Sequence, residues 1–447
     1  MMRRKGQVGD FRSRRRVTTR GMSLVLLAAS VLSAAGCNHA TQFAGDWPMF
    51  RGGPARLGAD GASSLPDRPP AVAWVFTDGT ARLPVTFWSS PIVRGQRLYV
   101  GGGALSPFGT RGYIYCLDVS GAGAGPQPPR VLWKHKVDKL VFSSPALTAG
   151  IVLCGEGTHT DTDTALYALQ SDSPDPQGQR LWRFQVPGPV EASPCVDGGR
   201  VYFGTWDDFH CLDLRTGRPL WKATVVDVLS SPVVANGMVY VGSGRSEQAR
   251  PENRAVPGRQ LLALDAATGL VRWREALPYA CSSPITYADG RLIAGAGKGT
   301  FILAGAGRSA GAVICHDAAT GRPLWSRQLP DNVLAAIPVA AGLVHAACRD
   351  GKYYLMSLAD GQLLWEYAAD AALLASPIVS GDRVLLLSSK GVAHCLDVKA
   401  RSLLWKLDLP QAAGQPKTAQ VFSSPMLAGG HIYVGLADRG LVCLRPS

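Results

Sequence analysis

The chain has 447 residues, 46% of them hydrophobic and 18% charged, and a formal net charge of +13. Residues 1–36 hold eight of the 46 Lys and Arg residues beside a single acid, Asp10, so the rest of the chain carries 38 basic and 32 acidic residues, a net charge of +6. Because this charge is spread thinly and forms no basic stripe with interleaved aromatic residues, the composition argues against nucleic acid as a partner.

Residues 1–36 are predicted to be a cleavable signal peptide with an Arg-rich start. An apolar run over residues 22–32 follows the basic stretch and ends in small residues. The run is too short to span a bilayer stably, and its order of segments is that of an export signal. Gly36-Cys37 resembles the lipobox of bacterial lipoproteins, although Ala34 stands where Leu is usual. The resemblance implies that Cys37 is lipidated and anchors the chain to a membrane; the alternative is an ordinary signal peptide with an incidental cysteine.

Residues 37–70 are expected to form the lipidated N-terminus and a lead-in segment, and a repeated domain begins at residue 71. A Ser-Ser-Pro element or a close variant, a Gly-centred strand pair and a closing Trp recur at a period of roughly 40 to 50 residues. The prolines of the opening element are Pro91, Pro145, Pro194, Pro232, Pro284, Pro338, Pro377 and Pro425. The tryptophans, which are expected to dock neighbouring repeats against each other, are Trp74, Trp133, Trp182, Trp221, Trp273, Trp325, Trp365 and Trp405.

The fourth repeat displays the pattern of a single unit. Strand-like segments at residues 230–234 and 238–242 flank an Asn-Gly pair, which favours a tight hairpin turn, and a Thr-Gly turn follows the third segment, residues 260–265. Each unit therefore predicts four antiparallel strands, one blade of a propeller. The last unit has only three, and residues 71–76 with Trp74 are expected to supply the fourth. The sequence thus predicts an all-β fold over residues 71–447, an eight-bladed β-propeller with 3+1 closure of the last blade.

Nine cysteines follow Cys37. Alignment of the repeats places the following residues at one slot of the third strand: Cys116, Ala168, Cys211, Ala263, Cys315, Ser357, Cys395 and Cys443. Because every occupant is small, we expect a tight buried site in which the cysteines remain free thiols. Three His-Cys adjacencies do not predict a metal site, since neighbours on a strand point to opposite faces.

The connections between second and third strands are long in four repeats, at residues 102–111, 156–164, 243–259 and 298–310. In a propeller these connections share a face with the links between blades, so this face is the expected binding surface. Residues shortly before the Ser-Ser-Pro elements are expected to crowd one mouth of the central channel: Phe87, Trp88, Phe142, Leu229, Tyr279 and Phe422. They form a candidate binding site for a peptide or strand of a partner; the alternative is that they only plug the channel.

Residues 263–273 resemble the tryptophan-docking motif of the PQQ-type quinoprotein propellers, Ala-x-Asp-x-x-Thr-Gly-x-x-x-Trp, a WD-like repeat. Residues 211–221 and 315–325 differ from it only by cysteine in place of the first Ala. The resemblance covers residues 46–447 and implies the fold. Dehydrogenases of this family also need an adjacent Cys-Cys pair, a Ca²⁺ site and a catalytic Asp, whereas this chain has no adjacent cysteines and no matching acidic cluster. No catalytic, cofactor-binding or metal-binding residue is therefore predicted, and PQQ with Ca²⁺ is retained as the alternative cofactor.

The leader and the propeller together are similar to the BamB family, accessory lipoproteins of the outer-membrane β-barrel assembly machinery. This resemblance implies a noncatalytic scaffold that holds an envelope protein partner, either at the periplasmic face of the outer membrane or in the periplasm. We expect the propeller to be a monomer. Two other classes of function stay open: a PQQ-dependent quinoprotein oxidoreductase, and a binding module for a glycan or small ligand on the same face.

Overall fold

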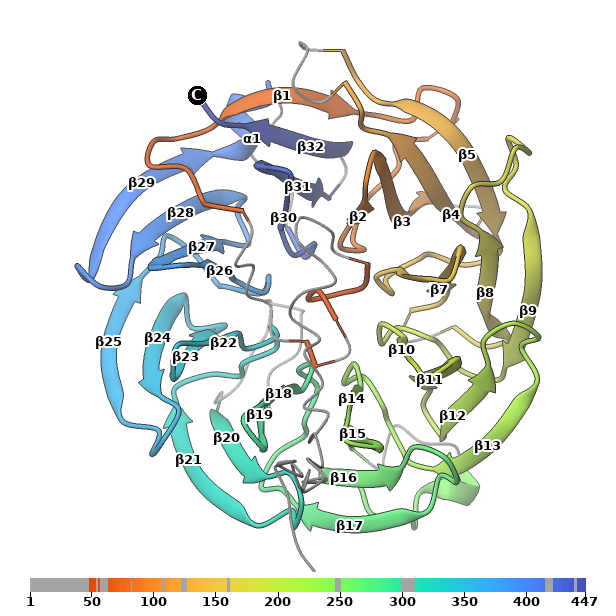
Figure 1. Cartoon of the computed structure of the whole chain (residues 1–447), viewed down its shortest axis with the longest axis vertical. Helices are drawn as coiled ribbons and strands as arrows, with labels where there is room; N and C mark the ends of the chain where they lie inside the picture. Colours follow the sequence, from red (N-terminus) through yellow and green to blue (C-terminus); the bar gives the residue numbers. More distant parts are fainter. Residues whose placement is uncertain are drawn as a thin grey trace, which may run out of the picture. The chain divides into compact units, whose positions relative to one another are not determined.

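Eight four-stranded antiparallel sheets stand around a central axis in the computed structural model (Figure 1). The structure describes residues 48–53, 55–56, 63–81, 83–106, 109–121, 127–158, 161–245, 251–298, 310–414, 421–437 and 440–447. The expected signal peptide and the expected lipidation site Cys37 lie outside these ranges. The sheets belong to the unit Phe43–Ser447, and Met1–Gln42 is a separate unit.

Each sheet is one blade, and its strands follow one another outward from the axis. Blade 1 consists of β2 (Ile92–Arg94), β3 (Arg97–Ser106), β4 (Gly109–Asp118) and β5 (Arg130–Val137); blade 2 of β6 (Ala146–Thr148), β7 (Ile151–Gly155), β8 (Thr164–Gln170) and β9 (Arg180–Val186). Blade 3 consists of β10 (Cys195–Asp197), β11 (Arg200–Gly204), β12 (Asp208–Asp213) and β13 (Pro219–Thr224); blade 4 of β14 (Val233–Ala235), β15 (Met238–Gly242), β16 (Gln260–Asp265) and β17 (Val271–Ala276). Blade 5 consists of β18 (Thr286–Ala288), β19 (Arg291–Gly297), β20 (Gly311–Asp317) and β21 (Pro323–Leu329); blade 6 of β22 (Val339–Ala340), β23 (Leu343–Ala347), β24 (Lys352–Ser357) and β25 (Leu363–Ala368). Blade 7 consists of β26 (Ile378–Ser380), β27 (Arg383–Leu387), β28 (Val392–Asp397) and β29 (Ser402–Asp408).

Blade 8 is built from both ends of the domain. Its first three strands are β30 (Met426–Ala428), β31 (His431–Leu436) and β32 (Gly440–Arg445), and its outer strand is β1 (Ala71–Phe76). β1 pairs antiparallel with β32, with Trp74 opposite Cys443. The predicted eight blades and 3+1 closure are confirmed.

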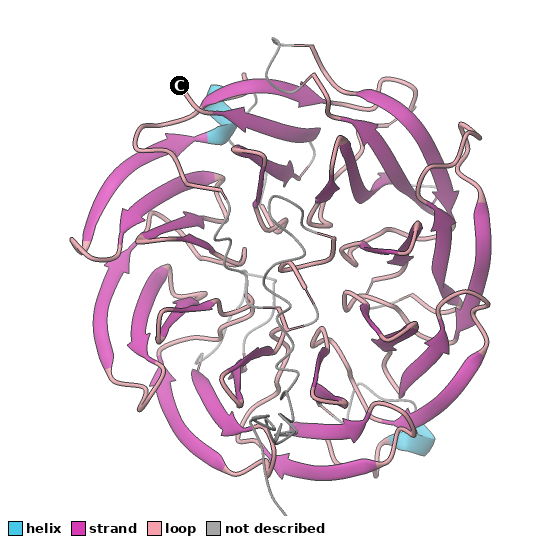
Figure 2. Cartoon of the chain, viewed as in Figure 1, coloured by secondary structure: helices cyan, strands magenta, loops and turns pink. Residues whose placement is uncertain are grey.

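Among the described residues, helix is confined to the short α1 (Leu409–Ala412) and the 3-10 turn η3 (Pro251–Asn253), and the blades consist of strands joined by loops (Figure 2). Within the described ranges no helix has the length and apolar character needed to cross a membrane.

The antiparallel order of each blade gives the ring two different faces. We call the face with the first-to-second and third-to-fourth strand connections the turn face, and the opposite one, with the second-to-third and blade-to-blade connections, the loop face. The expected long connections between second and third strands therefore lie on the loop face. The prediction of a loop at residues 102–111 is wrong, because β3 continues to Ser106 and β4 begins at Gly109, which makes this connection a projecting hairpin.

Tryptophan and glycine form one recurring contact between neighbouring blades. The indole N–H donates to a main-chain carbonyl of the next blade, at 2.9 to 3.1 Å, in these pairs: Trp133 to Ser171, Trp182 to Leu214, Trp221 to Ala266, Trp273 to Ala318 and Trp325 to Leu358. The ring also lies on a turn glycine of the next blade, so close that a Cβ added at Gly269 would stand 2.5 Å from the Trp221 ring. Each such pair excludes any larger residue from the turn.

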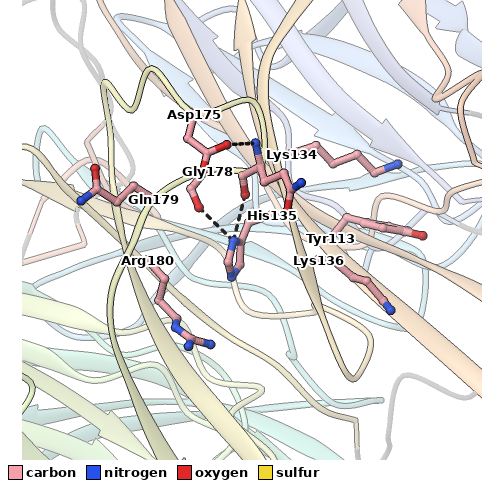
Figure 3. A pocket seen from close by; sticks show the side chains of 9 residues that line it. Tyr113, Lys134, His135, Lys136, Asp175, Gly178, Gln179 and Arg180 are labelled. Atoms are coloured by element: carbon pink, nitrogen blue, oxygen red, sulfur yellow. Dashed lines mark hydrogen bonds between the residues drawn. The ribbon is translucent and has the colours of Figure 1, made fainter.

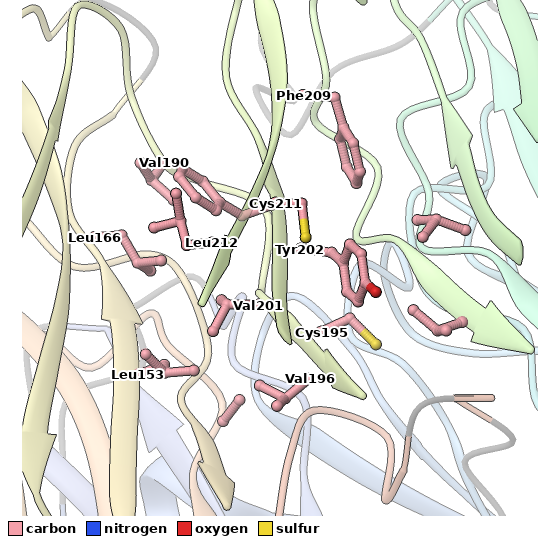
Figure 4. Packing of buried hydrophobic residues seen from close by; sticks show 14 of the residues in the cluster. Leu153, Leu166, Val190, Cys195, Val196, Val201, Tyr202, Phe209, Cys211 and Leu212 are labelled. Carbon is pink, nitrogen blue, oxygen red and sulfur yellow. The ribbon is translucent and has the colours of Figure 1, made fainter. Parts of the chain in front are cut away.

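All nine described cysteines are buried, and none of them forms a disulfide. The predicted slot opposite Trp is occupied as expected in seven blades, but its assignment in blade 6 is wrong: Leu355, not Ser357, pairs with Trp365. The slot is therefore not restricted to small residues. Cys211 shows its usual setting, packed with aliphatic and aromatic side chains of the core that continues from blade 2 to blade 4 (Figure 4).

Candidate functional site

Serine hydroxyls join neighbouring blades around the centre of the ring. The main-chain N–H of Ser90 in blade 1 donates to Oγ of Ser144 in blade 2, at 3.1 Å. The same link recurs at 2.9 to 3.0 Å from Ser144 to Ser193, Ser193 to Ser231, Ala336 to Ser376, Ser376 to Ser424 and Ser424 to Ser90. We call these six links the serine belt. They give the second serine of the repeated Ser-Ser-Pro element its physical role, since each hydroxyl satisfies a buried amide of the adjacent blade.

The alignment of the repeats by their prolines is wrong by one residue in blade 5. The Thr286–Ile293 pair of blade 5 is equivalent to the Ile92–Tyr99 pair of blade 1. Counting back from Thr286 therefore puts Pro284 at the belt position, one residue before the position that proline has in blade 1. Proline has no N–H and no hydroxyl, and so it can form neither side of a belt link.

Blade 6 deviates in the opposite direction. Pro338 lies opposite His345 in the strand ladder, where the other blades have the residue that follows the proline. The residue at the belt position is therefore Ala336. Alanine keeps its N–H, which donates to Ser376, but it has no hydroxyl to accept a bond. Between blades 4 and 6 the belt therefore has no links.

The lead-in segment, which we define as the described residues among 48–56, lies inside the ring (Figure 1). Met49 forms an antiparallel bridge with Ala146 of β6, and Pro48 accepts a hydrogen bond from the N–H of Leu147 at 2.5 Å. A guanidinium nitrogen of Arg51 donates to the carbonyl of Pro377 in blade 7, also at 2.5 Å. The segment therefore contacts innermost strands from different sides of the axis.

Arg56 lies next to the break in the serine belt, with its side chain on blades 3 and 4. Its side chain is fully buried, and its Nε donates to Pro232 O at 2.6 Å. Nη1 donates to Phe50 O at 3.1 Å, and Nη2 to the carbonyls of Ser193 and Pro194 at 2.8 and 3.2 Å. Burial lowers the pKa of the guanidinium below its ordinary value. Four main-chain carbonyls, contributed by blades 3 and 4 and by the segment itself, thus bind the cation.

The main chain of the lead-in segment continues this contact into blade 5. The N–H of Tyr287 donates to the carbonyl of Ala55 at 3.1 Å, and Thr286 Oγ1 lies 3.3 Å from the carbonyl of Arg56. The hydroxyl of Thr286 also donates to Ile337 O of blade 6 at 2.8 Å. Blades 4, 5 and 6 lack belt links to one another, and the lead-in segment and this threonine connect them instead.

The predicted channel-mouth residues lie at the loop-face side of the belt but not as one group. Phe87 is buried among Phe76 and Tyr115, and so it belongs to the core between blades 8 and 1. The rings of Trp88 and Phe142 are stacked, with centroids 4.6 Å apart, and both are partly exposed.

Three other predicted mouth residues surround the same axis. Leu229 and Phe422 precede their serines by the same interval as Trp88 and Phe142 and are partly exposed. Tyr279 lies earlier in its connection, with Lys298 Nζ 5.8 Å from the ring centroid. The structure therefore brings four of the six into equivalent places at the mouth.

Buried carboxylates fix the connections on the loop face. Glu156, only 1% exposed, accepts the N–H groups of Asp138 and Lys139 at 2.9 and 3.0 Å and the hydroxyl of Tyr167 at 3.1 Å. Burial raises the pKa of Glu156 despite these bonds. Since the amides belong to the link between blades 1 and 2, this carboxylate holds the base of its connection rigidly against the neighbouring blade.

A shallow cavity of about 580 Å³ lies on the rim, between β5 and the connection that precedes β9 (Figure 3). His135 Nδ1 lies 3.0 and 3.1 Å from the carbonyls of Gln177 and Gly178, and the N–H of Lys134 donates to Pro176 O. These bonds show the cavity to be the seam where a connection of blade 2 packs on the outer strand of blade 1.

The residues present do not fit a PQQ and Ca²⁺ site. Within the described ranges no three His, Cys, Asp or Glu side chains are grouped so as to hold a metal ion. The centre of the ring carries instead two buried guanidinium groups, of Arg51 and Arg56, with main-chain carbonyls. Buried His210 and His316, each beside a cysteine, have pKa values lowered to about 4 by burial.

Sequence reasoning missed the serine belt and the role of Arg56. The second serine of the repeat was a visible signal for the belt, since a hydroxyl repeated once per blade implies a repeated bond. Arg56 gave no such signal, because its partners are main-chain carbonyls, which leave no mark on the sequence.

Comparisons with known proteins add the family. A family profile described as outer membrane protein assembly factor BamB matches residues 170–254 and 309–447, about half of the chain. The outer membrane protein assembly factor BamB of Bordetella pertussis is 24% identical over 370 residues, which cover 80% of this chain and 83% of the relative.

Two solved structures show the same fold. BamB from Moraxella catarrhalis aligns with a TM-score of 0.56 at 17% identity, over 81% of this chain and 98% of that one. Quinohemoprotein alcohol dehydrogenase from Comamonas testosteroni aligns with a TM-score of 0.63 at 13% identity, over 90% of this chain and 80% of that one. At these identities the likeness concerns the fold alone.

Proposed function

Because the chain belongs to the family of outer membrane protein assembly factor BamB, we propose that it is a noncatalytic scaffold of the cell envelope that holds a protein partner. The observation that carries the proposal is the occupied centre of the ring. The lead-in segment lies in it with Arg56 fully buried, so we expect a partner to bind on an outer face. A propeller without a central reaction site serves by presenting rigidly held connections.

The loop face is the proposed partner surface. It carries the stacked, partly exposed rings of Trp88 and Phe142, and aromatic side chains of this kind anchor protein interfaces. The connection that begins at Glu156 is held at its base by hydrogen bonds to the neighbouring blade. Preformed connections reduce the entropy lost on binding.

We further propose that the protein is an exported lipoprotein with its lipid on Cys37, and that the propeller is a monomer. The leader sequence and the name of the Bordetella pertussis relative support placement at the periplasmic face of the outer membrane. Metabolic labelling with a fatty acid tests the anchor: a Cys37→Ala variant should lose the label.

Affinity purification of the full chain from detergent-solubilised envelopes tests the scaffold. We expect a component of the outer-membrane assembly machinery to co-purify, and a Trp88→Ala/Phe142→Ala variant to recover much less of it. Leu270→Ala is the matched control, since Leu270 is an exposed apolar residue of the turn face. Failure to recover an assembly component, or equal recovery by both variants, contradicts the proposal.

The same purified protein tests the alternative enzyme. A quinoprotein takes up stoichiometric PQQ in the presence of Ca²⁺, with a change in the absorbance of the quinone. We expect neither uptake nor spectral change. Stoichiometric uptake would overturn the noncatalytic assignment.

A further inference from the structure

The chain reaches the centre of the ring from the turn face. β6 begins beside the serine belt near the loop face and runs toward its hairpin turn on the turn face. The bridge between Met49 and Ala146 is antiparallel, so the lead-in segment runs in the opposite direction, from the turn face inward. The bond from the N–H of Leu147 to Pro48 O agrees, since Leu147 is the next residue toward the turn face.

The chain also leaves the centre on the turn face. The hydroxyl of Ser380, at the end of β26, donates to Ser63 O, and Arg383, at the start of β27, donates to Leu65 O. Both residues flank the turn between these strands. The indole of Trp405 then donates to Pro66 O at 2.9 Å, shortly before the chain enters β1 on the rim.

Burial fixes this path. Arg56 cannot leave its four carbonyls without exposing them, and Leu65 is likewise fully buried, packed among residues of blades 7 and 8. The attachment of the N-terminal chain to the ring is therefore rigid and lies close to the axis.

We propose that the ring is suspended from the membrane with its turn face toward the lipid surface, which leaves the loop face directed away and open to the protein partner. This inference rests on the lipid anchor proposed for Cys37. Pro48 follows Cys37 by eleven residues, which span at most about 40 Å when fully extended.

The length of the tether favours this orientation over the reverse. A path from the axis to a bilayer on the loop-face side must pass under the four strands of a blade, about 14 Å at the usual strand spacing, and then climb along the rim. β13, the outer strand of blade 3, has six residues, which correspond to about 20 Å of that height. The sum, about 34 Å, uses most of the reach of the tether at full extension, whereas a bilayer at the turn face needs little of it.

The two ends of β3 provide a matched pair of probes. Gln96 is exposed in the turn before β3, on the turn face, and Leu105 is 57% exposed near its other end, on the loop face. Gln96→Cys and Leu105→Cys variants of the full chain can be labelled selectively, because the described native cysteines are buried and Cys37 carries the lipid. The unsubstituted protein is the labelling control.

The experiment places each labelled lipoprotein in vesicles of phosphatidylethanolamine and phosphatidylglycerol with a nitroxide quencher on the headgroups. We expect a loss of fluorescence from the label at residue 96 and little loss at residue 105. A Gly/Ser insertion that doubles the distance between Cys37 and Pro48 should reduce the difference.

Equal quenching at the two sites, or stronger quenching at residue 105, overturns the orientation while the lipid anchor stands. Vesicle flotation, measured on the same samples, tests the anchor by itself. If the protein does not float with the vesicles, the anchor and the orientation both fail. Recovery of the envelope partner is unaffected by either result and remains the separate test of the scaffold.

Discussion

Arg56 is a buried cation whose four hydrogen-bond acceptors are main-chain carbonyls and not carboxylates. Its acceptors are the carbonyls of Phe50, Ser193, Pro194 and Pro232. Desolvation makes such a charge costly, and hydrogen bonds to the charged group offset part of that cost. What the arginine provides is geometry, since its fork of donors reaches carbonyls of two blades at once.

Arg56→Met should destabilise the fold by about 2–4 kcal/mol, because it leaves carbonyl groups without donors in a buried site. The free energy of unfolding in urea measures the effect. Arg215→Met, which removes the same charge at an exposed turn, is the control and should change stability by less than about 0.5 kcal/mol. Equal losses of stability in the two variants would show that the removal of a positive charge, and not the loss of the buried hydrogen bonds, causes the destabilisation.

His210 should make the fold sensitive to acid. It is buried with its ring stacked on Phe203 at 5.0 Å, and burial lowers its pKa to about 4. In the unfolded chain a histidine titrates near 6.5, so the neutral form favoured by the fold contributes stability above that pH. This contribution is lost as the pH falls from about 6.5 to about 4.

A His210→Phe variant should therefore lose less stability than the unsubstituted protein between pH 7 and pH 4.5, since phenylalanine keeps the stacking and binds no proton. Urea unfolding at the two values measures the difference. His431→Phe, at a partly exposed histidine on the turn face, serves as the comparison variant. If His210→Phe shows the full acid sensitivity, the buried ring is not its source.

Between elements, the recurring contact is a tryptophan of one blade on a turn glycine of the next. Gly217, Gly269 and Gly321 adopt φ values of +67°, +74° and +75° and lie against Trp182, Trp221 and Trp273. We propose that this pair sets the spacing of the blades. Glycine is needed twice over: for the positive φ, and for the room its missing Cβ leaves.

Two glycines of blade 4 separate these effects. Gly237 has a φ of +72° with open space around its Cα, whereas a Cβ at Gly269 meets the Trp221 ring at 2.5 Å. Gly237→Ala should cost about 1 kcal/mol for the backbone conformation. Gly269→Ala should cost a further 1–3 kcal/mol, roughly, for the clash. Thermal unfolding compares the two, and equal losses would contradict the spacing role.

At the scale of the whole molecule, the ring has no free end because β1 completes blade 8. Hydrogen exchange tests this closure. Amides of β1 should exchange as slowly as those of β17, the outer strand of blade 4, since a closed ring has no terminal repeat that frays. Trp74→Ala should speed exchange in both β1 and β32. Rapid exchange of β1 in the unsubstituted protein would indicate an open ring.

The sequence was sufficient to predict the eight blades and their closure, because Trp spacing and turn glycines repeat once per blade. The register of blades 5 and 6 could not be read from prolines, since Pro284 is sterically acceptable at the belt position and Pro338 within the strand. The occupied centre could not be predicted either. The contacts of Arg56 join main-chain atoms 137, 138 and 176 residues away, and such distant pairings carry no local pattern.

The position of the lead-in segment also determines the order in which the chain can fold. Arg51 finds its acceptor 326 residues later, and β1 has no partner until the last strand, β32, is available. The part that is synthesised first is therefore among the last to reach its native place. Until the ring closes, we expect cysteines that the folded structure buries to be more accessible to oxidants. If the leader exports the chain as proposed, disulfide formation would compete with closure of the ring.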